Sequence, residues 1–433
     1  MFGLQRSRDT REHAGSWYAA TANGGGDYPV LEDSISTEIV VVGAGFTGTN
    51  LALELAERGH EVVLLEANRL GWGASGRNGG QIIGGIGHDP ERFERHIGSE
   101  GVQRIYRLGV EARDIIRERV EKYAIDCDLK WGYCDVALKP RHLDAFAAWK
   151  AHEERIGNPH HYRLLDREEL QAFVASEAYL GGLYNDGNGH LHPLNLCLGE
   201  ARAAASLGTR IYEQSRAVAL ERGERPRVHT ERGSVSARRV VLCGNAYLGN
   251  LVPRLASRIL PSVSAIIATE PLGEERARAL IPGDVAVCDP RTALDYFRLS
   301  ADRRLLFGGL SNYTGLEPKD LVGTLRRKML KVFPSLEDAA IDYAWSGRIG
   351  IGLNRMPQLG HLDDNVSYIQ AYSGHGVAPT HVMARITAAM LDGDPRDFDI
   401  FARIPHWPFP GGRLLRRPGL ALGMAYYKLR DAL

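Results

Sequence analysis

The stretch EIVVVGAGFTG, residues 38–48, decides how this chain folds. Residues 39–42 form a continuous β-branched run, as a strand buried on both faces of a parallel sheet requires. The spacing of apolar residues predicts a helix over 46–57, and a second buried strand follows at 61–66. A strand, a tight turn, a helix and a parallel strand in this order predict the opening of a doubly wound α/β fold.

The turn between the first strand and the helix carries Gly43, Gly45 and Gly48 in a GxGxxG pattern. Glycine permits the tight turn, lets a pyrophosphate approach the backbone, and allows the helix to pack closely against the strand. The helix N-terminus supplies N–H donors and the positive end of a dipole for the phosphates. Glu66 ends the second strand, at a spacing that suits a carboxylate accepting from a ribose hydroxyl. This context predicts a dinucleotide site.

Two further glycine-rich turns indicate which dinucleotide is bound. Glu66 would repel a 2′-phosphate, which leaves NAD and FAD. The loop at 71–87 holds eight glycines among 17 residues, and such a loop lets backbone approach a flat ring system edge-on. The turn at 374–376 precedes a helix at 377–391, whose N-terminus stabilises negative charge. Because reduced flavin accumulates charge at its N1–C2=O edge, the pattern favours FAD, with an NAD-dependent dehydrogenase as the alternative.

Composition excludes several other classes of protein. The chain has 433 residues, and its 53 basic side chains balance 53 acidic ones, which argues against a nucleic-acid partner. No two of the five cysteines have CxxC spacing and their number is odd, so neither a metal site nor a disulfide framework is expected. The apolar uncharged stretch at 39–53 is shorter than the roughly 20 residues of a membrane helix. The N-terminus lacks an apolar signal segment, and we expect a cytoplasmic protein.

The predicted domain layout is interleaved. Segments with the dinucleotide motifs alternate with segments of mixed helix and strand character. The chain therefore leaves the nucleotide-binding domain twice for a second domain, built on an antiparallel or mixed sheet, and returns each time. In chain order the predicted parts are an N-terminal arm at 1–35, a nucleotide-binding domain at 36–87, 188–260 and 345–400, a second domain at 88–187 and 261–344, and a C-terminal extension at 401–433.

Two local patterns yield further predictions. The run NDGNG at 185–189 is typical of a turn. Near the C-terminus, arginines precede an apolar stretch at 420–427, a pattern also found in helices that lie in a membrane interface. Gly419 and Gly423 weaken a free-standing helix by about 1 kcal/mol each. We therefore expect this segment to pack on the protein's own surface, without membrane association.

Six stretches of the chain resemble the D-amino-acid-oxidase-type flavoproteins. The glycine motifs are shared throughout that family, whereas the N-terminal arm and the proline-rich C-terminal stretch are more particular to the γ-glutamylputrescine oxidases of bacterial polyamine catabolism. The resemblance covers nearly the whole chain. The stretches are SWYAATAN at 16–23, GASGRNGGQ at 73–81, GHLHPLNL at 189–196, GNAYLG at 244–249, YSGHG at 372–376 and HWPFPGGR at 406–413.

The resemblance implies a Rossmann-like FAD-binding domain of the glutathione-reductase-2 type, interleaved with an α+β substrate domain. Some relatives attach the flavin to a cysteine at the start of the segment matching 350–353; no cysteine lies there, so non-covalent FAD is expected. The implied FAD contacts are Ala44, Gly45, Phe46 and Thr47 for the phosphates, Glu66 with Ala67 for the ribose, Val218 for the adenine, Gly244, and, for the flavin ring, Ser75, Gly76, Arg77, Asn78, Gly79, Gly80, Gln81, Gly374, His375 and Gly376.

The same resemblance implies the oxidative deamination of a γ-glutamylated or free polyamine. A neutral amine gives hydride to flavin N5, and the resulting imine hydrolyses to an aldehyde and ammonia. Three residues are the candidates for the reaction site: His375, through its backbone N–H before its imidazole, and Tyr296 and Tyr372 as aromatic walls over the flavin. An aromatic wall would also attract a cationic amine.

The resemblance leaves the electron acceptor and the substrate open. Sarcosine-oxidase-type relatives carry a lysine near flavin N5 that promotes reaction with O2, but the matching strand at 305–307 has none. Arg303 or Arg304 is the candidate replacement, and the acceptor is O2 or another oxidant. One alternative substrate is a secondary amino acid such as sarcosine, proline or pipecolate, which would need an arginine or lysine beside the flavin. A non-catalytic FAD-binding partner protein is the alternative outside enzymes, and the oligomeric state is open.

Overall fold

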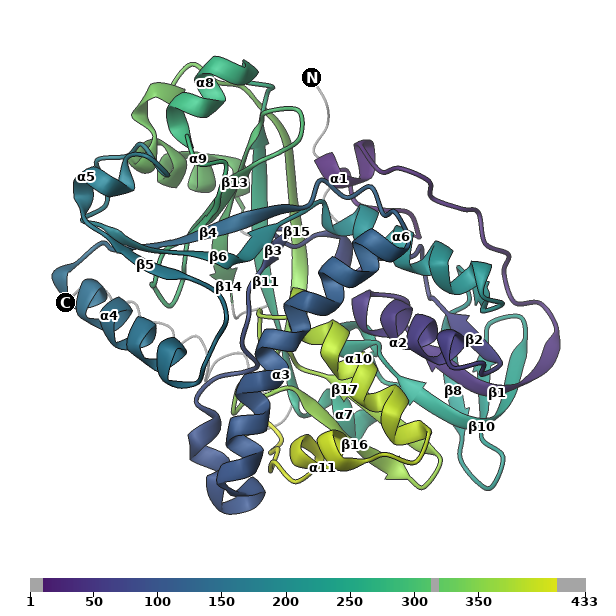
Figure 1. The fold of residues 1–433 in the computed structure, drawn as a ribbon. Coiled ribbons are helices and arrows are strands. Elements are labelled where there is room, and N and C mark those ends of the chain that lie inside the picture. Colours follow the sequence, from purple (N-terminus) through teal and green to yellow (C-terminus); the bar gives the residue numbers. More distant parts are fainter. Residues whose placement is uncertain (1–10, 313–318, 411–433) are drawn as a thin grey trace.

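The computed structural model describes residues 11–312 and 319–410. In this part of the chain, helices surround one sheet of eight strands and another of nine (Figure 1). Both sheets contain parallel and antiparallel pairs, and each is assembled from segments far apart in the sequence. This mixed α/β architecture confirms the predicted fold class.

The first sheet has a parallel centre. Val41 of β1 (Ser34–Val42) lies opposite Val241 on one side and Leu64 on the other, and all three are fully buried. Burial on both faces is what the β-branched run at 39–42 predicts. The strand order is β16 (Gln358–Asp363), β17 (Val366–Gln370), β10 (Ser234–Leu242), β1, β2 (Val62–Leu65) and β7 (Arg210–Tyr212), with the hairpin of β8 (Ala217–Glu221) and β9 (Arg227–Thr230) attached to β10.

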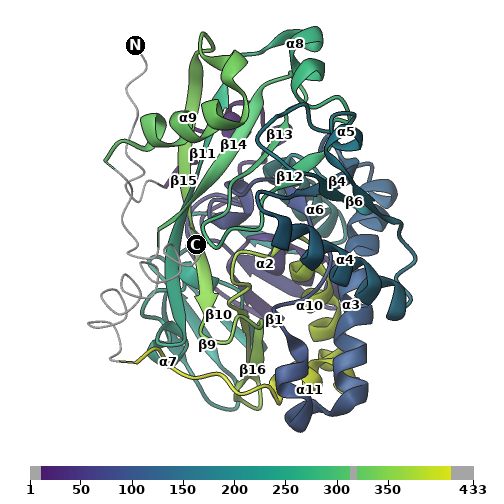
Figure 2. The ribbon, with the colours of Figure 1, turned by 90° about the vertical axis from the view of Figure 1, so that its left-hand side faces the viewer.

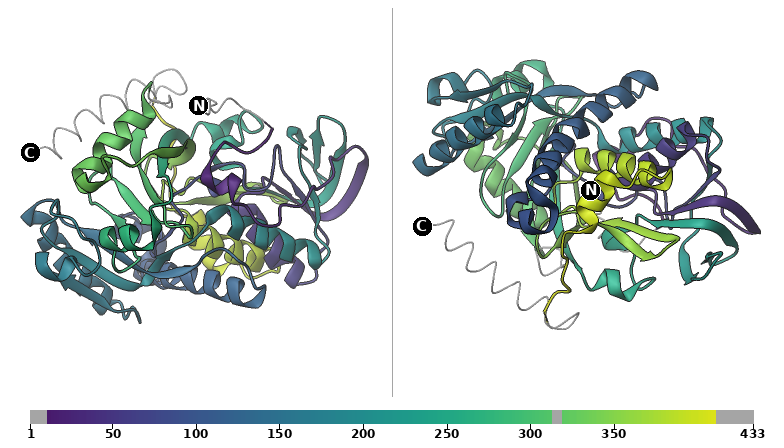
Figure 3. Two further views of the ribbon diagram at one scale, coloured as in Figure 1. Left: turned by 90° about the horizontal axis from the view of Figure 1, so that it is seen from above. Right: turned by 60° about the horizontal axis from the view of Figure 1, so that its bottom comes forward.

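Helices pack around α2 (Phe46–Glu57), which begins at the predicted residue. Its residues 46–56 are buried, as expected for a helix covered on all sides. α6 (Pro193–Ser206) and α10 (Val377–Leu391) flank it, and the long α3 (Glu94–Lys122) runs alongside α10 (Figure 3). Two short helices complete this group: α1 (Trp17–Ala20) packs on α6 and α11 (Arg396–Ala402) packs on α10.

The second sheet presents two different faces. On one face, Phe297 stacks on Phe307 beneath α9 (Leu321–Val332), and α8 (Gly273–Leu280) and α9 lie at the opposite end of the molecule from α11 (Figure 2). The order is β15 (Ile341–Gly352), β11 (Ile259–Thr269), β14 (Leu305–Asn312), β13 (Tyr296–Leu299), β12 (Ala286–Cys288), β4 (Lys130–Val136), β6 (Gly182–His190) and β3 (Gln81–Ile82), with β5 (Tyr162–Leu165) beside β6. α4 (Pro140–Arg155) and α5 (Arg167–Leu170) connect β4, β5 and β6, and α7 (Pro253–Ala256) lies between β10 of the first sheet and β11.

Two sequence-based expectations differ from this arrangement. The predicted turn at 185–189 is wrong, because these residues continue β6 as an extended strand. Glycine is needed there for close strand approach: a Cβ on Gly189 would collide with the carbonyl oxygen of Lys130. The expected domain boundary at residue 345 falls inside β15, which belongs to the second sheet over its whole length.

The expected packing of the C-terminal extension concerns 411–433, and these residues lie outside the described part of the chain. Within the described ranges, no helix combines the length and the apolar character that crossing a bilayer requires.

A buried ion cluster joins α2, α3 and α10. Arg119, 2% exposed, donates to Glu54 at 2.5 Å and to Glu57 at 2.7 Å, and Arg385 donates to Glu54 at 2.9 Å. Removing one partner of a buried pair leaves an uncompensated charge. The cluster therefore fixes the long α3 against the two helices that pack on the first sheet.

We expect Glu54→Gln to lower the free energy of unfolding by about 3 kcal/mol, because Arg119 stays buried while one of its paired carboxylates is lost. Urea unfolding of the purified protein measures this loss. Asp114→Asn is the matched control, since Asp114 pairs with Arg117 on the exposed side of the same α3, and such a pair contributes at most about 1 kcal/mol. Equal losses in the two variants would contradict a special role for the buried cluster.

Candidate cofactor and active site

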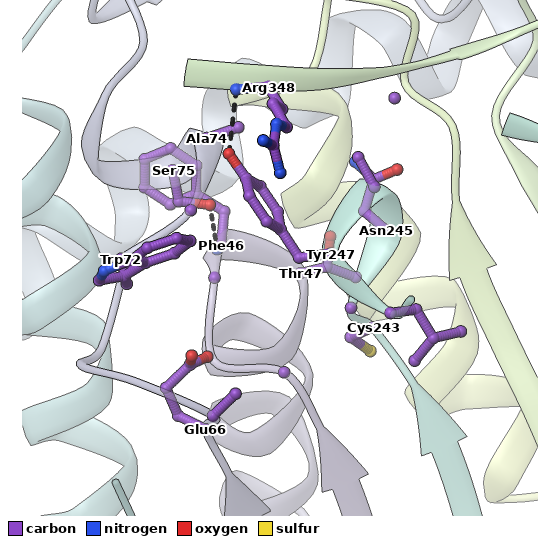
Figure 4. A pocket seen from close by; sticks show the side chains of 18 of the residues that line it. Phe46, Thr47, Glu66, Trp72, Ala74, Ser75, Cys243, Asn245, Tyr247 and Arg348 are labelled. Carbon is purple, nitrogen blue, oxygen red and sulfur yellow. Dashed lines mark hydrogen bonds between the residues drawn. The ribbon is translucent and has the colours of Figure 1, made fainter. Parts of the chain in front are cut away.

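A pocket of about 410 Å³ lies at the carboxyl ends of β1, β2 and β10 (Figure 4). Ligands of doubly wound sheets bind at such an edge. The N-termini of α2 and α10 both border it. Of the residues singled out in the sequence, the pocket lining contains Gly43, Gly45, Phe46, Thr47, Glu66, Ala67, Ser75, Asn78, Gly244, Tyr372, Gly374 and Gly376.

The glycine turn before α2 leaves no room for side chains. Gly43 has a φ of +102°, and a Cβ on Gly48 would collide with the carbonyl oxygen of Gly43. Gly45 caps α2 without any side-chain bond, while Phe46 N–H donates to Ser75 Oγ at 2.9 Å. This end of the helix therefore presents backbone and a hydroxyl to the pocket, which is an arrangement suited to an anion.

Glu66 is held at the pocket wall by two backbone donors. Ala44 N–H donates to Oε2 and Asn68 N–H to Oε1, both at 2.9 Å. Burial raises the pKa of the Glu66 carboxyl, and these two hydrogen bonds act in the opposite direction. The N–H of Ala44, which is predicted to contact a phosphate, donates to Glu66 in this structure. Ala44 therefore orients the carboxylate that faces the pocket.

A second turn brings the start of α10 to the same pocket. Ala371, Ser373 and Gly374 all have positive φ, and Gly376 caps α10 without a side-chain bond. Tyr372 Oη and Thr47 Oγ1 share a hydrogen bond of 2.8 Å, which ties this turn to the first turn of α2. Burial raises the pKa of the Tyr372 phenol, so it stays neutral and positions the two turns.

The glycine loop at 71–80 is braced by its own side chains. Arg77, which is buried, donates from Nε to Trp72 O at 2.8 Å and lies over the Trp72 ring. Trp345 Nε1 donates to Arg77 O at 3.0 Å. Asn78 donates to Ser75 O at 2.8 Å and accepts from Gly80 N–H at 2.7 Å. The guanidinium of Arg77 thus stabilises the loop through its contacts with Trp72 and does not line the pocket.

Several predicted cofactor contacts lie outside the described pocket lining: Ala44, Gly48, Gly76, Arg77, Gly79, Gly80, Gln81, Val218 and His375. Val218 is 51% exposed, and its neighbour Ala217 lines the pocket instead. Gly79 and Gln81 face the second sheet: a Cβ on Gly79 would stand 2.6 Å from the Tyr296 ring, and Gln81 Nε2 donates to Val287 O at 2.9 Å.

His375 does not offer the backbone donor expected of it, because its N–H donates to Tyr372 O at 3.1 Å. Its Nε2 lies 3.0 Å from Ile83 O, and burial lowers the pKa of the ring. The imidazole is therefore neutral and donates to Ile83. Tyr296 lies on β13 of the second sheet, where its hydroxyl meets Ser264 Oγ at 3.2 Å and burial raises its pKa.

The arginines considered as replacements for the missing lysine are already neutralised. Arg303 pairs with Glu274 and Asp284, and Arg304 with Asp302 and Asp342. A different cation, Arg298, is fully buried and donates to backbone carbonyls, including Gly79 O at 2.8 Å. The segment at 305–307 is buried and apolar.

Residues missed by the sequence reasoning also line the pocket, chiefly Trp72, Asn245, Tyr247 and Arg348 (Figure 4). The hydroxyl of Tyr247 accepts from Arg348 N–H at 2.9 Å. The stretch GNAYLG contained the signal, but only its first glycine was singled out. In the described part of the chain, no group of three His, Cys, Asp or Glu side chains could hold a metal ion.

Comparisons with known proteins identify relatives over nearly the full length. Gamma-glutamylputrescine oxidoreductase of Escherichia coli K12 is 45% identical over 98% of this chain and 99% of its own. The probable oxidoreductase OrdL of Haemophilus influenzae is 39% identical over 97% of this chain and 98% of its own. Among solved structures, glycine oxidase from Geobacillus kaustophilus superposes with a TM-score of 0.72 over 86% of this chain and 99% of its own, at 21% identity.

The likeness to glycine oxidase, at its low identity, shows the fold. The model of the FAD dependent oxidoreductase (DAO) family matches residues 38–390. This match confirms the resemblance found in the sequence and decides for FAD over NAD. Together with the identity of the full-length relatives, it shows that the chain is an FAD-dependent oxidoreductase and belongs to the DAO family.

Proposed function

We propose that the protein oxidatively deaminates γ-glutamylputrescine or a related polyamine to an aldehyde and ammonia. The observation that carries the proposal is the 45% identity over almost the whole of both chains to the E. coli enzyme named for this substrate. FAD, when bound, accepts the hydride from the carbon beside the amine, and water then hydrolyses the imine. The electrons pass on to O2 or another acceptor.

The residues present fit FAD. A Cβ at Gly48 or Gly45 would collide with neighbouring atoms, so both positions require glycine. Without side chains there, the backbone beside α2 is open to a pyrophosphate. Glu66, fixed by two N–H donors, would accept from the ribose. The start of α10 would face the end of the flavin that becomes negative, since a helix N-terminus stabilises negative charge. The cysteines of the chain are buried free thiols outside 350–353, which supports non-covalent binding.

The site supplies orientation, and the described residues offer no charged base for the amine. His375 is neutral and donates to Ile83 O, and the phenols of Tyr296 and Tyr372 are held neutral by burial. The substrate amine would thus enter already deprotonated. Tyr296, packed against Gly79, would form an aromatic wall beside the glycine loop.

The positions of the arginines favour a γ-glutamylated diamine over a secondary amino acid. An amino acid substrate carries its carboxylate beside the reacting carbon and needs a buried cation there. The two arginines in the described lining, Arg216 and Arg348, are both exposed to solvent. The buried Arg77 and Arg298 instead hold backbone carbonyls. The cytoplasmic location of the protein and the identity of its electron acceptor stay predictions.

We expect γ-glutamylputrescine, or else putrescine or spermidine, to bleach the flavin under anaerobic conditions, and sarcosine, glycine and pipecolate to react far more slowly. Flavin absorbance in a stopped-flow instrument measures each rate. Bleaching by the amino acids alone would favour the alternative substrate class. If no member of the panel reduces the flavin, the proposed function is wrong.

We expect Glu66→Gln to raise the dissociation constant for FAD about tenfold, because a hydrogen bond to a charged acceptor contributes about 1.5–3 kcal/mol and an amide replaces only part of it. Titration of the apoprotein with FAD, followed by flavin fluorescence, measures this constant. Glu61→Gln is the matched control, since the Glu61 side chain is 61% exposed and pairs with Arg210. An unchanged FAD affinity in Glu66→Gln would remove Glu66 from the ribose site.

A further inference from the structure

A row of residues in register crosses the second sheet on the face opposite to Phe297 and Phe307. Residues directly opposite on neighbouring strands share a face. The row starts on β15, ends on β4 and crosses the four strands between them. Its members are Trp345, Ile266, Gly308, Tyr296, Cys288 and Asp135.

One end of this row lies against the glycine loop of the cofactor site. Trp345 Nε1 donates to Arg77 O at 3.0 Å. The Tyr296 ring covers Gly308, where a Cβ would collide with it, and reaches Gly79. The row therefore runs from the cofactor loop outward along the sheet, with Tyr296 as the last member in contact with the loop.

Asp135, at the other end of the row, is its charged member. It neighbours Cys288 in register, and Tyr133 lies two residues earlier on the same face of β4. Tyr133 is 2% and Cys288 8% exposed, whereas Asp135 retains accessible surface. Burial raises the pKa of the Asp135 carboxyl to about 7.

No described cation pairs with Asp135, in contrast to Asp289 and Asp295, two enclosed acids that flank β12 and β13. Asp289 and Asp295 bind Arg291, and Lys328 adds a bond to Asp295 at 2.6 Å. An enclosed carboxylate without a counter-charge is costly, and that cost is relieved when a cation arrives. The arrangement is complementary to a ligand that brings an ammonium group.

The spacing suits a substrate with two nitrogens. Two strand separations place Asp135 about 10 Å from Tyr296 along the row. In γ-glutamylputrescine, ten bonds join the terminal amine to the glutamyl ammonium, about 12 Å when extended, and in putrescine five bonds join its two nitrogens, about 6 Å. An amine held beside Tyr296 thus leaves the far ammonium of the longer molecule close to Asp135.

We propose that Asp135 binds the second, non-reacting ammonium group of a diamine-type substrate and so selects for substrates that carry an ammonium far from the reacting amine. This inference rests on the proposed function and specifies the residue that recognises its substrate class. Secondary amino acids have a single nitrogen, at the reacting carbon, and gain nothing from a carboxylate so far along the sheet.

The test separates binding from chemistry with anaerobic flavin reduction at varied substrate concentration. Asp135→Asn should raise the apparent dissociation constant of γ-glutamylputrescine about thirtyfold, because one partner of an enclosed charge pair is lost. Its limiting reduction rate should stay within about twofold of wild type, since the reacting amine is positioned elsewhere. n-Butylamine, which has one nitrogen, should bind equally to both proteins.

Two further variants complete the design. Asp135→Glu keeps the charge and should recover most of the affinity. Asp186→Asn removes an acid on the adjacent β6 whose side chain is 41% exposed, and it should behave as wild type. A similar loss of affinity for n-butylamine, or no loss for γ-glutamylputrescine, would overturn the role of Asp135. If γ-glutamylputrescine and the other amines leave wild-type flavin oxidised, the proposed function falls and this proposal falls with it.

Discussion

A buried hydrogen-bond cluster fixes the distance between the two helices whose N-termini border the pocket. Glu200 on α6 accepts from Asn50 of α2 at 2.8 Å and meets His381 Nε2 of α10 at 2.7 Å. The same two side chains hold the first turns of their own helices: Asn50 donates to Phe46 O and His381 Nδ1 to Val377 O.

The Glu200 cluster matters for the pocket because the helix dipole stabilises negative charge only within the first turn of a helix. A small rotation of α10 relative to α2 would move one N-terminus away from the pocket. The Tyr372–Thr47 bond on the pocket side and the Glu200 cluster on the far side act on the same pair of helices. The glycine turns can be left without side-chain caps because these polar contacts hold the helices in place.

The parts of the fold that sequence could predict are those set by local patterns. The strand, turn and helix at 38–57 follow from a β-branched run and glycine spacing, and α2 begins at the predicted Phe46. The NDGNG run has the composition of a turn, but pairing with Lys130 and neighbouring residues of β4 extends it into β6. In that case tertiary contacts outweigh local preference.

The site was less predictable because bonds within the chain decide which groups face outward. The GxGxxG spacing locates Ala44 and the YSGHG stretch locates His375, yet the N–H of each is taken by a partner that no spacing reveals, Glu66 and Tyr372. Asp135 has no motif around it. Its relation to Tyr296 exists only through the register of three strands from different parts of the chain.

The two sheets acquire charge in different ways, and this difference follows from how each is built. Parallel strands followed by helices place helix N-termini at one edge, so the first sheet offers positive potential to an anionic dinucleotide. The second sheet is largely antiparallel and has no such dipoles at the face that meets the glycine loop. Charge on that face must come from side chains, and along the row the charged member is Asp135. In the proposed function, the helix N-termini of the first sheet would hold the anionic cofactor, and Asp135 of the second sheet would hold the far ammonium of the substrate.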